Sequence, residues 1–281
     1  MKIGITGLGL IGGSMAKAIK ETKEHTVYGY DIDESTVLAA ELTGAIDGIL
    51  SEENLPECDI VIVSLYPEAT VDYIIKNADR FKKDCIVFDC SGVKRSVCDK
   101  INPVAKEHGF TFIGGHPMAG TQFWGFGSSR ASLFKGASMI LTPHGVSDIA
   151  VLDNAKHFFL SLGFSEITFS SPEEHDRIIA YTSQLAHVVS NAYVKSPTAL
   201  RHRNFSAGSY KDLTRVARLN ETMWTELFFE NRENLLHELD SVIGSLEKYR
   251  EALRDGDRDG MKALLKEGRE LKERTMYNEK N

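Results

Sequence analysis

The glycine-rich segment GLGLIGGS, residues 7–14, constrains the fold more than any other feature of this sequence. Gly7, Gly9 and Gly12 have the spacing G-x-G-x-x-G and directly follow an apolar run that begins at Ile3. In a strand–turn–helix unit the first glycine permits a tight turn, the second lets a pyrophosphate approach the backbone, and the third lets helix and strand pack closely. The first amides of the helix then point at the anion. The segment therefore predicts a dinucleotide-binding site.

An acidic residue follows at the position that selects the nucleotide. Asp31 ends the second apolar run, and no Arg or Lys stands between it and Glu34. A carboxylate there binds the ribose hydroxyls and repels a 2′-phosphate, so we predict NAD in preference to NADP. Asp31 could instead cap the next helix, but Asp33 fits that role better because Ser35 follows it as a helix opens.

The apolar residues before about residue 170 form short continuous runs, which indicate buried strands. The runs are KIGITG, TVYGYD, DIVIVSL, CIVFDC, FTFIGG, SMILT and EITFS. Such runs are typical of strands buried on both faces of a parallel sheet. Helical stretches lie between them, at 13–24 and 68–82 for example. This alternation predicts an α/β Rossmann-type domain with a mostly parallel sheet over residues 1–170.

After about residue 170 the period changes to that of helices. The segment 173–195 has helical spacing, and 220–254 has no proline and reads as one long helix. From Leu235 onward the apolar steps alternate four and three, which is a coiled-coil type of seam. Its partner is another helix of this chain or the same helix of a second copy; we favour the second copy. We therefore expect an all-α domain over residues 171–281 that forms a homodimer.

Composition and charge exclude several classes of protein. The net charge of −7 argues against a nucleic-acid binder. The uncharged run 110–129 contains five glycines and a proline, so we expect no membrane span. The cysteines at 58, 85, 90 and 98 form no C-x-x-C pair and are expected to be buried thiols in a reducing compartment. We expect a cytoplasmic protein.

No metal site is expected from the sequence. The acidic segment DGDRDG at 255–260 resembles the start of a calcium loop, but Lys266 stands where that loop needs a glutamate. We therefore expect a solvated turn between two helices. The histidines offer no close ligand pair of the H-E-x-x-H type.

The segment IGGHPMAGTQFWGF, residues 113–126, places His116 among small residues. His116 could be a buried core histidine in a tight turn, or a group held on a stiff loop to move a proton. The parallel-sheet pattern puts it just past the end of a strand, where doubly wound folds bind their ligands. The second interpretation is therefore favoured.

Five segments together resemble the prephenate dehydrogenase family, which includes the arogenate and cyclohexadienyl dehydrogenases of tyrosine biosynthesis. They are GLGLIGGS, D-x-x-x-V-K from Asp89 to Lys94, GGHPMAG, HD…TSQLAH and KDLTRVA…MW, in the family's order and over essentially the whole chain. The resemblance implies NAD-dependent oxidative decarboxylation of prephenate to 4-hydroxyphenylpyruvate. It implies that His116 handles the hydroxyl proton and Arg215 binds a substrate carboxylate.

The resemblance also implies the other site residues. His187 resembles a second substrate-side histidine, and Trp224 a tryptophan near the mouth of the pocket. The expected catalytic set is His116, Ser91, His187 and Arg215, and the expected substrate-binding set is Gln122, Lys211, Asp212 and Trp224. The expected cofactor contacts are Gly7, Gly9, Leu10, Ile11, Gly12, Asp31, Leu65, Tyr66 and Pro67. Arg215 could instead pair with Asp212 on the surface, and His187 and Trp224 could be core residues.

The sequence departs from the family pattern at four positions. Gly92 replaces a serine, so Ser91 is expected to supply the hydroxyl from a shifted position; otherwise something else orients His116. Gln122 replaces an acid, Gln184 stands where some members have histidine, and Lys211 where many have arginine. These departures leave the choice between prephenate and arogenate open. More distant alternatives are another two-domain hydroxyacid dehydrogenase and a non-catalytic NAD-sensing protein.

Overall fold

The computed structural model describes residues 1–146 and 148–278. The chain divides into two compact units, Met1–Arg232 and Glu233–Asn281. The first unit contains the sheet and all the site residues expected from the sequence. The expected division at residue 170 stays a prediction, because the helices just after it belong to the first compact unit.

The described residues of the first unit form an eight-stranded sheet in the order β3-β2-β1-β4-β5-β6-β7-β8. Every neighbouring pair is parallel except β6 and β7. The predicted, mostly parallel α/β sheet is thereby confirmed. The strands are β1 (Lys2–Thr6), β2 (Thr26–Tyr30), β3 (Gly48–Ile49), β4 (Ile60–Val63), β5 (Ile86–Asp89), β6 (Thr111–Pro117), β7 (Ser138–Thr142) and β8 (Glu166–Phe169).

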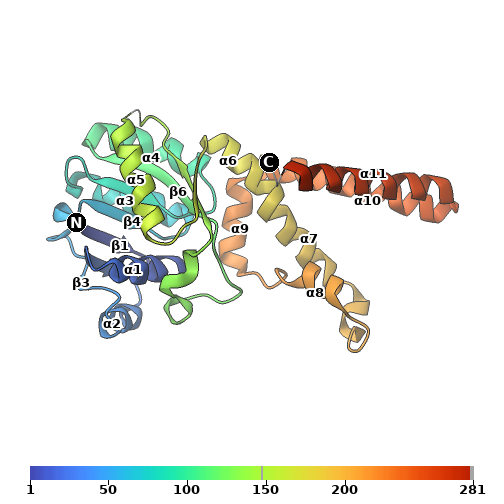
Figure 1. Ribbon diagram of the computed structural model, residues 1–281, viewed down its shortest axis with the longest axis horizontal. Helices are drawn as coiled ribbons and strands as arrows, with labels where there is room; N and C mark the ends of the chain where they lie inside the picture. Colours follow the sequence, from blue (N-terminus) through green and yellow to red (C-terminus); the bar gives the residue numbers. More distant parts are fainter. Residues whose placement is uncertain (147, 279–281) are drawn as a thin grey trace. The chain divides into compact units, whose positions relative to one another are not determined.

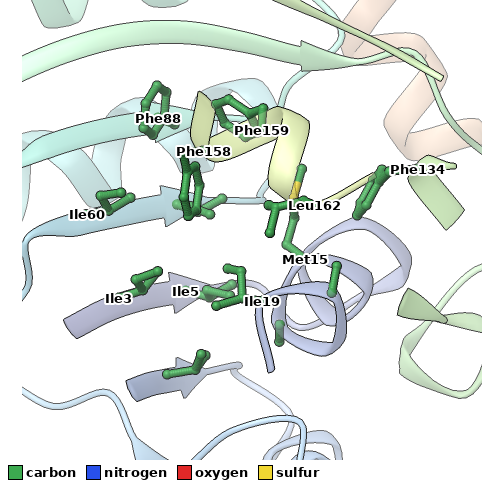
Figure 2. Close-up of a cluster of buried hydrophobic side chains, with 14 of the residues drawn as sticks. Ile3, Ile5, Met15, Ile19, Ile60, Phe88, Phe134, Phe158, Phe159 and Leu162 are labelled. Atoms are coloured by element: carbon green, nitrogen blue, oxygen red, sulfur yellow. The ribbon is translucent and has the colours of Figure 1, made fainter. Parts of the chain in front are cut away.

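Helices cover both faces of this sheet (Figure 1). They are α1 (Leu10–Thr22), α2 (Glu34–Leu42), α3 (Pro67–Asn77), α4 (Arg95–His108) and α5 (Ile149–Ser161). Strand β4 shows why its sequence is continuously apolar. Ile60 and Ile62 lie in one core cluster, with side chains of α1 and α5, and Val61 and Val63 in the other, with α3 and α4. Figure 2 shows the first cluster, in which Met15 and Phe158 pack over the strands.

The helical segment of the first unit follows β8. A nearly continuous rod consists of α6 (Pro172–Ile179), the π-helical turn η5 (Ala180–Leu185) and α7 (Ala186–Tyr193) (Figure 1). Helices α8 (Gly208–Thr214) and α9 (Glu221–Glu230) come next. The short 3₁₀ turns of the unit are η1 (Leu55–Glu57), η2 (Ala78–Arg80), η3 (Phe126–Ser128), η4 (Ala131–Phe134) and η6 (Pro197–Arg201).

Helices α10 (Arg232–Asp255) and α11 (Arg258–Asn278) make up the second unit as an antiparallel hairpin (Figure 1). The Tyr249 hydroxyl donates to the Leu264 carbonyl at 3.5 Å. The turn between them, Gly256 and Asp257, lies within DGDRDG, where a turn was expected, and the rest of that segment belongs to the two helices. The prediction of a single helix over 220–254 is wrong, because Asn231 interrupts it and separates α9 from α10. Within the described residues, no helix is long and apolar enough to cross a membrane.

Candidate active site

The glycine loop lies at the switch point of the sheet, where β1 has β2 on one side and β4 on the other. Gly7 has a φ of +83°, and a Cβ atom there would collide with the Ser64 carbonyl at the end of β4. A Cβ atom on Gly12 would collide with the Gly7 carbonyl. Around the Cβ position of Gly9, by contrast, no atom lies within 4 Å. The loop is therefore closed by its first and third glycines and open at the second, where a phosphate would approach.

Asp31 follows β2 and faces this loop. Its Oδ2 accepts a 2.7 Å hydrogen bond from the Leu8 amide, and its Oδ1 accepts from the Asp33 amide. Asp33 is the residue that caps α2, through the Ser35 amide, as predicted. The remaining expected cofactor contacts surround the same loop: Leu10 and Ile11 begin α1, Leu65 packs against Gly7, Tyr66 is the N-cap of α3 and Pro67 its first residue.

A buried ion pair joins the carboxyl ends of β5 and β6. Asp89 and Lys94 both have fully buried side chains, and the ammonium contacts the carboxylate. The ammonium also donates to the Gly115 carbonyl at 2.6 Å, and the Gly115 amide donates to Asp89 Oδ1 at 2.9 Å. The Ser91 hydroxyl donates to the same carboxylate. Because a buried charge is costly unless it is paired and hydrogen-bonded, these contacts hold the two strand ends in one geometry.

His116 directly follows Gly115, whose backbone belongs to this buried ion-pair network. It lies within β6, opposite Ile140 of the antiparallel strand β7, and not past the strand end as expected. Its Nδ1 is 2.9 Å from Nε2 of His175, and Nδ1 of His175 is 2.8 Å from Oδ1 of Asp176. The ring of His116 is half-buried, and the Cβ position of Gly92 lies 3.9 Å from its Nε2. Three side chains from β6 and α6 thus form one hydrogen-bonded chain.

Asp176 is anchored independently of the histidines. Its Oδ1 accepts from the Lys94 amide at 2.7 Å and its Oδ2 from the Arg95 amide at 2.9 Å. These amides lie at the N-terminus of α4, where unsatisfied donors and the helix dipole favour a negative charge. The carboxylate is 1% exposed. Asp176 therefore fixes α6 against α4 and holds His175 in place.

A buried amide network supports the same region. Gln184 donates to the Leu227 carbonyl at 3.0 Å and accepts from Asn231 at 2.9 Å. Asn231 also donates to the Asp176 carbonyl at 2.8 Å. Both ends of the Gln184 amide are thus used inside the protein. Asn231 breaks the helix expected over 220–254 because its side chain bonds to two other segments of the unit.

A second cluster forms farther along the helical segment. His187 Nδ1 lies 2.8 Å from the Ser183 carbonyl, and its ring lies against Trp224 with centroids 4.0 Å apart. Arg215, at the C-terminus of α8, is close enough to lower the pKa of His187 electrostatically, although burial is the larger cause. Among the described residues Arg215 forms no ion pair with Asp212, so the surface-pair alternative is not what the structure shows.

The π turn η5 explains how His175 and His187 lie on the same side of the rod formed by α6, η5 and α7. Twelve residues of regular α-helix separate two side chains by about 120° around the axis, because each residue turns by about 100°. A π turn takes up one additional residue and so leaves residues 175 and 187 only about 20° apart. The burial pattern agrees, since Ile179 and Ala180 are followed by Gln184 and Leu185 on the buried side. η5 therefore directs His187 to the side of the rod that carries His175.

The remaining expected substrate residues are on the surface. Gln122, Lys211 and Asp212 are exposed, with no hydrogen-bonded partner among the described side chains. Two residues after Gln122, the Trp124 ring faces the Arg218 guanidinium at 5.2 Å, a distance typical of a cation–π contact. The loop is therefore connected to the segment between α8 and α9 without a carboxylate.

Burial favours the neutral forms of the histidines and cysteines around the site. The pKa of His116 lies well below its usual value because of desolvation, with smaller effects of His175 and Lys94. Burial also lowers the pKa of His175 and of His187. It raises the pKa of the four cysteine thiols, to about 11 for Cys58. In the described part of the chain, no three metal-ligating side chains come together.

His175, Asp176 and Lys94 belong to the site but are not among the site residues predicted from the sequence. Their segments HDRIIAYTSQLAH and DCSGVK do stand out, as polar groups among apolar or small residues. The sequence signal that points to these residues is a charged residue inside an otherwise apolar run. Such a residue must find a partner elsewhere in the fold.

Comparison with known proteins gives the chain a family. The model "Prephenate dehydrogenase, nucleotide-binding domain" matches residues 15–167, and "Prephenate dehydrogenase, dimerization domain" matches residues 171–267. The cyclohexadienyl dehydrogenase of Zymomonas mobilis is 31% identical over 281 residues, covering 96% of this chain and 94% of that protein. The prephenate dehydrogenase of Bacillus subtilis (strain 168) is 28% identical over 280 residues, covering 96% and 74%.

A solved structure agrees with both domain matches. Prephenate dehydrogenase from A. aeolicus, in complex with hydroxyphenyl propionate and NAD+, superposes with a TM-score of 0.83 at 30% identity. That match covers 99% of this chain and 98% of the other. With both domains matched in order over most of its length, this chain belongs to the prephenate dehydrogenase family.

Proposed function

We propose that this protein is an NAD-dependent prephenate dehydrogenase that converts prephenate to 4-hydroxyphenylpyruvate in tyrosine biosynthesis. The observation that carries the proposal is the orientation of His116. Its Nδ1 is already hydrogen-bonded, so its Nε2 is the atom left to meet a substrate. The carboxyl ends of β1, β4, β5 and β6 lie on one edge of the sheet, so this nitrogen is on the edge that carries the glycine loop.

The glycine loop fits NAD. The open space at Gly9 admits a pyrophosphate, and the amides at the start of α1 point toward it. The Asp31 carboxylate faces the loop and still has lone pairs for ribose hydroxyls, while its charge disfavours a 2′-phosphate. Bound NAD supplies a nicotinamide ring that accepts the hydride. The chain's own contribution is to bind the cofactor, orient the substrate and move one proton.

His116 moves that proton. As hydride leaves the ring carbon that bears the hydroxyl group, that oxygen becomes a carbonyl oxygen and must lose its proton to a neutral base. Burial lowers the pKa of His116 and so favours the neutral imidazole, whose Nε2 is the nitrogen not engaged by His175. The bond to the ring carboxylate then breaks, carbon dioxide departs, and its electron pair enters the ring. The oxygen takes a proton back to become a phenol, so the reaction consumes no proton overall.

The second cluster, which contains His187, Arg215 and Trp224, binds the substrate. Arg215 can bind a carboxylate through two parallel hydrogen bonds, and His187 offers its free Nε2 beside it. The Trp224 ring, which lies against His187 at an interplanar angle of 31°, provides a flat apolar wall. Ser91 supports the strand end through Asp89 and leaves the orientation of His116 to His175.

Charge favours prephenate over arogenate. The two acids differ in the side chain, which is a pyruvyl group in prephenate and carries an ammonium in arogenate. An ammonium group needs a carboxylate partner. The Asp212 carboxylate is exposed to solvent on α8, Gln122 is uncharged, and the cluster of Arg215 and His187 is cationic or neutral. The proposed side-chain pocket therefore suits a group that is only anionic or neutral.

One assay tests the proposal. NADH or NADPH formation is followed with prephenate and with arogenate, each with NAD and with NADP. We expect the highest kcat/KM for prephenate with NAD. A higher value for arogenate would reverse the choice of substrate, and the absence of turnover in all four combinations would overturn the function.

The domain roles and the assembly are part of the same proposal. Residues 1–170 bind the cofactor, and residues 171–281 complete the substrate site and form a homodimer in the cytoplasm. On α10, Leu246 and Leu253 of the apolar seam are 60% and 73% exposed in the single chain, which leaves them for a second copy. A solution mass of one 31.2 kDa chain would contradict the dimer.

A further inference from the structure

We propose that His175 is a positioning residue, which together with Asp176 sets the tautomer of His116 and stabilises it while it holds the substrate proton. The inference rests on the proposed function of His116 as the proton acceptor. It concerns two residues that hydrogen-bond in series behind that ring, at 2.9 Å and 2.8 Å.

The direction of each hydrogen bond follows from its acceptor. The Asp176 carboxylate can only accept, so Nδ1 of His175 carries the proton that it receives. A neutral His175 then has a lone pair on Nε2, and Nδ1 of His116 must donate to it. A neutral imidazole carries one ring N–H, and in His116 that proton is on Nδ1. Nε2 of His116 is thereby left as the base.

Asp176 can define this order because its carboxylate is held in one place and can only accept hydrogen bonds. The carboxylate accepts from the amides of Lys94 and Arg95 as well as from His175, and it is 1% exposed. Three donors directed at one carboxylate fix its position and leave it as the acceptor in each contact. The charge of Asp176 is therefore held at the N-terminus of α4, from which it orients His175.

Other groups near His116 do not perform this task. Ser91 directs its hydroxyl at Asp89, and Gly92 has no side chain to offer, although its Cβ position lies 3.9 Å from Nε2 of His116. Lys94, the nearest fixed cation, donates to Asp89 and to Gly115. Among the described side chains, His175 is the hydrogen-bond partner of the His116 ring.

The chain of three residues also fits the balance of protons. The hydroxyl proton moves to Nε2 of His116 as hydride leaves, and the imidazolium then donates more strongly from Nδ1 to His175. Asp176 compensates the added positive charge through the second ring. When carbon dioxide has left, the ring oxygen takes the proton back from Nε2. The arrangement stabilises a transient cation, which is the known function of a carboxylate behind a catalytic imidazole.

The direct test is the tautomer of His116 in the unmodified protein. ¹⁵N-labelled histidine allows NMR to distinguish protonated from unprotonated ring nitrogens. We expect His116 with a protonated Nδ1 and an unprotonated Nε2 at pH 7.5, and His175 with the same tautomer. His116 protonated on Nε2 in the free protein would overturn the inference without any variant.

Two variants of His175 then test whether kcat depends on the orientation of His116, since both variants retain His116 itself. His175→Phe retains the buried ring and removes the acceptor, so we expect kcat to fall at least ~10-fold while KM for NAD stays the same. The His116 signals should then show both tautomers. His175→Gln offers an amide oxygen at about the same place and should recover most of kcat. Wild-type kcat and a single tautomer in folded His175→Phe would overturn the inference.

A control and a comparison make the outcome specific. His108 pairs with Asp79 at 2.9 Å, away from the site, and His108→Gln should leave kcat unchanged. If His116→Asn retains wild-type kcat, the proposed function of His116 fails. If His116→Asn is inactive and His175→Phe is fully active, only the positioning role of His175 fails.

Discussion

Two parts of one sheet edge are built in opposite ways. The glycine loop at β1 is formed by backbone groups and by the absence of side chains, mostly between Gly7 and Asp31, with the Ser64 carbonyl after β4 as a contact from outside this segment. The histidine cluster at β6 is formed by buried side chains that lie up to 82 positions apart, as between Lys94 and Asp176. A loop of the first kind depends on local sequence and a cluster of the second kind depends on the whole fold. Substitutions should therefore affect the two parts differently.

The largest effect is expected where the histidine cluster depends on a buried charge. Lys94→Met leaves the Asp89 carboxylate buried without its cation, and breaking such a pair costs about 3–5 kcal/mol of unfolding free energy. The exposed pair of Lys2 and Glu57 is the matched control, and Lys2→Met should change the unfolding free energy far less, because solvent screens an exposed ion pair. Chemical denaturation measures both. Equal costs would mean that the buried pair does not hold the strand ends.

The next effect separates chemistry from cofactor binding. His116→Asn should lower kcat by at least ~100-fold, the low end for a group that handles a proton, while the Kd for NAD stays unchanged. Steady-state kinetics and calorimetry measure the two quantities. Near-wild-type kcat would show that the histidine cluster is structural.

Binding of the substrate should depend on Arg215. Arg215→Gln removes a charged hydrogen-bond donor, and we expect KM for prephenate to rise about 10–100-fold with a small change in kcat. Arg203→Gln, at another exposed arginine of the same unit, is the control. An unchanged KM would leave Arg215 without a substrate role.

The π turn gives a geometric test of the same cluster. Deletion of Thr182 removes one residue from η5 and turns α7 by about 100°, so we expect KM for prephenate to rise at least ~10-fold. Thr182→Ala keeps the length of the rod and should behave like the wild type. Thermal unfolding shows whether the deletion variant is folded. Equal KM values for both variants would mean that the direction of His187 does not matter.

The smallest effect is expected at the cofactor loop. Asp31→Ser removes the charge that repels a 2′-phosphate but leaves the backbone cradle intact. The preference for NAD over NADP, measured as a ratio of kcat/KM values, should fall several-fold while the unfolding temperature changes little. An unchanged ratio would assign the selectivity to another residue.

The glycine loop could be predicted from the sequence because its determinants are local. The positive φ of Gly7 and the contact of Gly12 with the Gly7 carbonyl lie within a single strand–turn–helix unit, and Asp33 caps the helix that it precedes. The alternating strands and helices were equally plain, because β4 is buried on both faces and is apolar throughout. In these regions short-range patterns and the fold carry the same information.

The histidine cluster could be predicted only in part. His116 was identified, but the contact that orients it comes from His175, which lies 59 positions later. Its placement within β6 depends on pairing with the antiparallel strand β7, which no local pattern reveals. The break at Asn231 was missed for the same reason, because its cause is a set of hydrogen bonds to Asp176 and Gln184.

The π turn has a consequence for how this helix is aligned with those of related sequences. Wide turns are rare and usually occur at functional sites, since a regular α-helix is the more favourable arrangement. A single-codon deletion would remove η5 and restore regular winding. The π turn therefore gives up regular winding while it sets the direction of the His187 side chain. In an alignment, a homologue that lacks the additional residue should be shifted by one gap within 180–185, or its histidine will be matched to the wrong face.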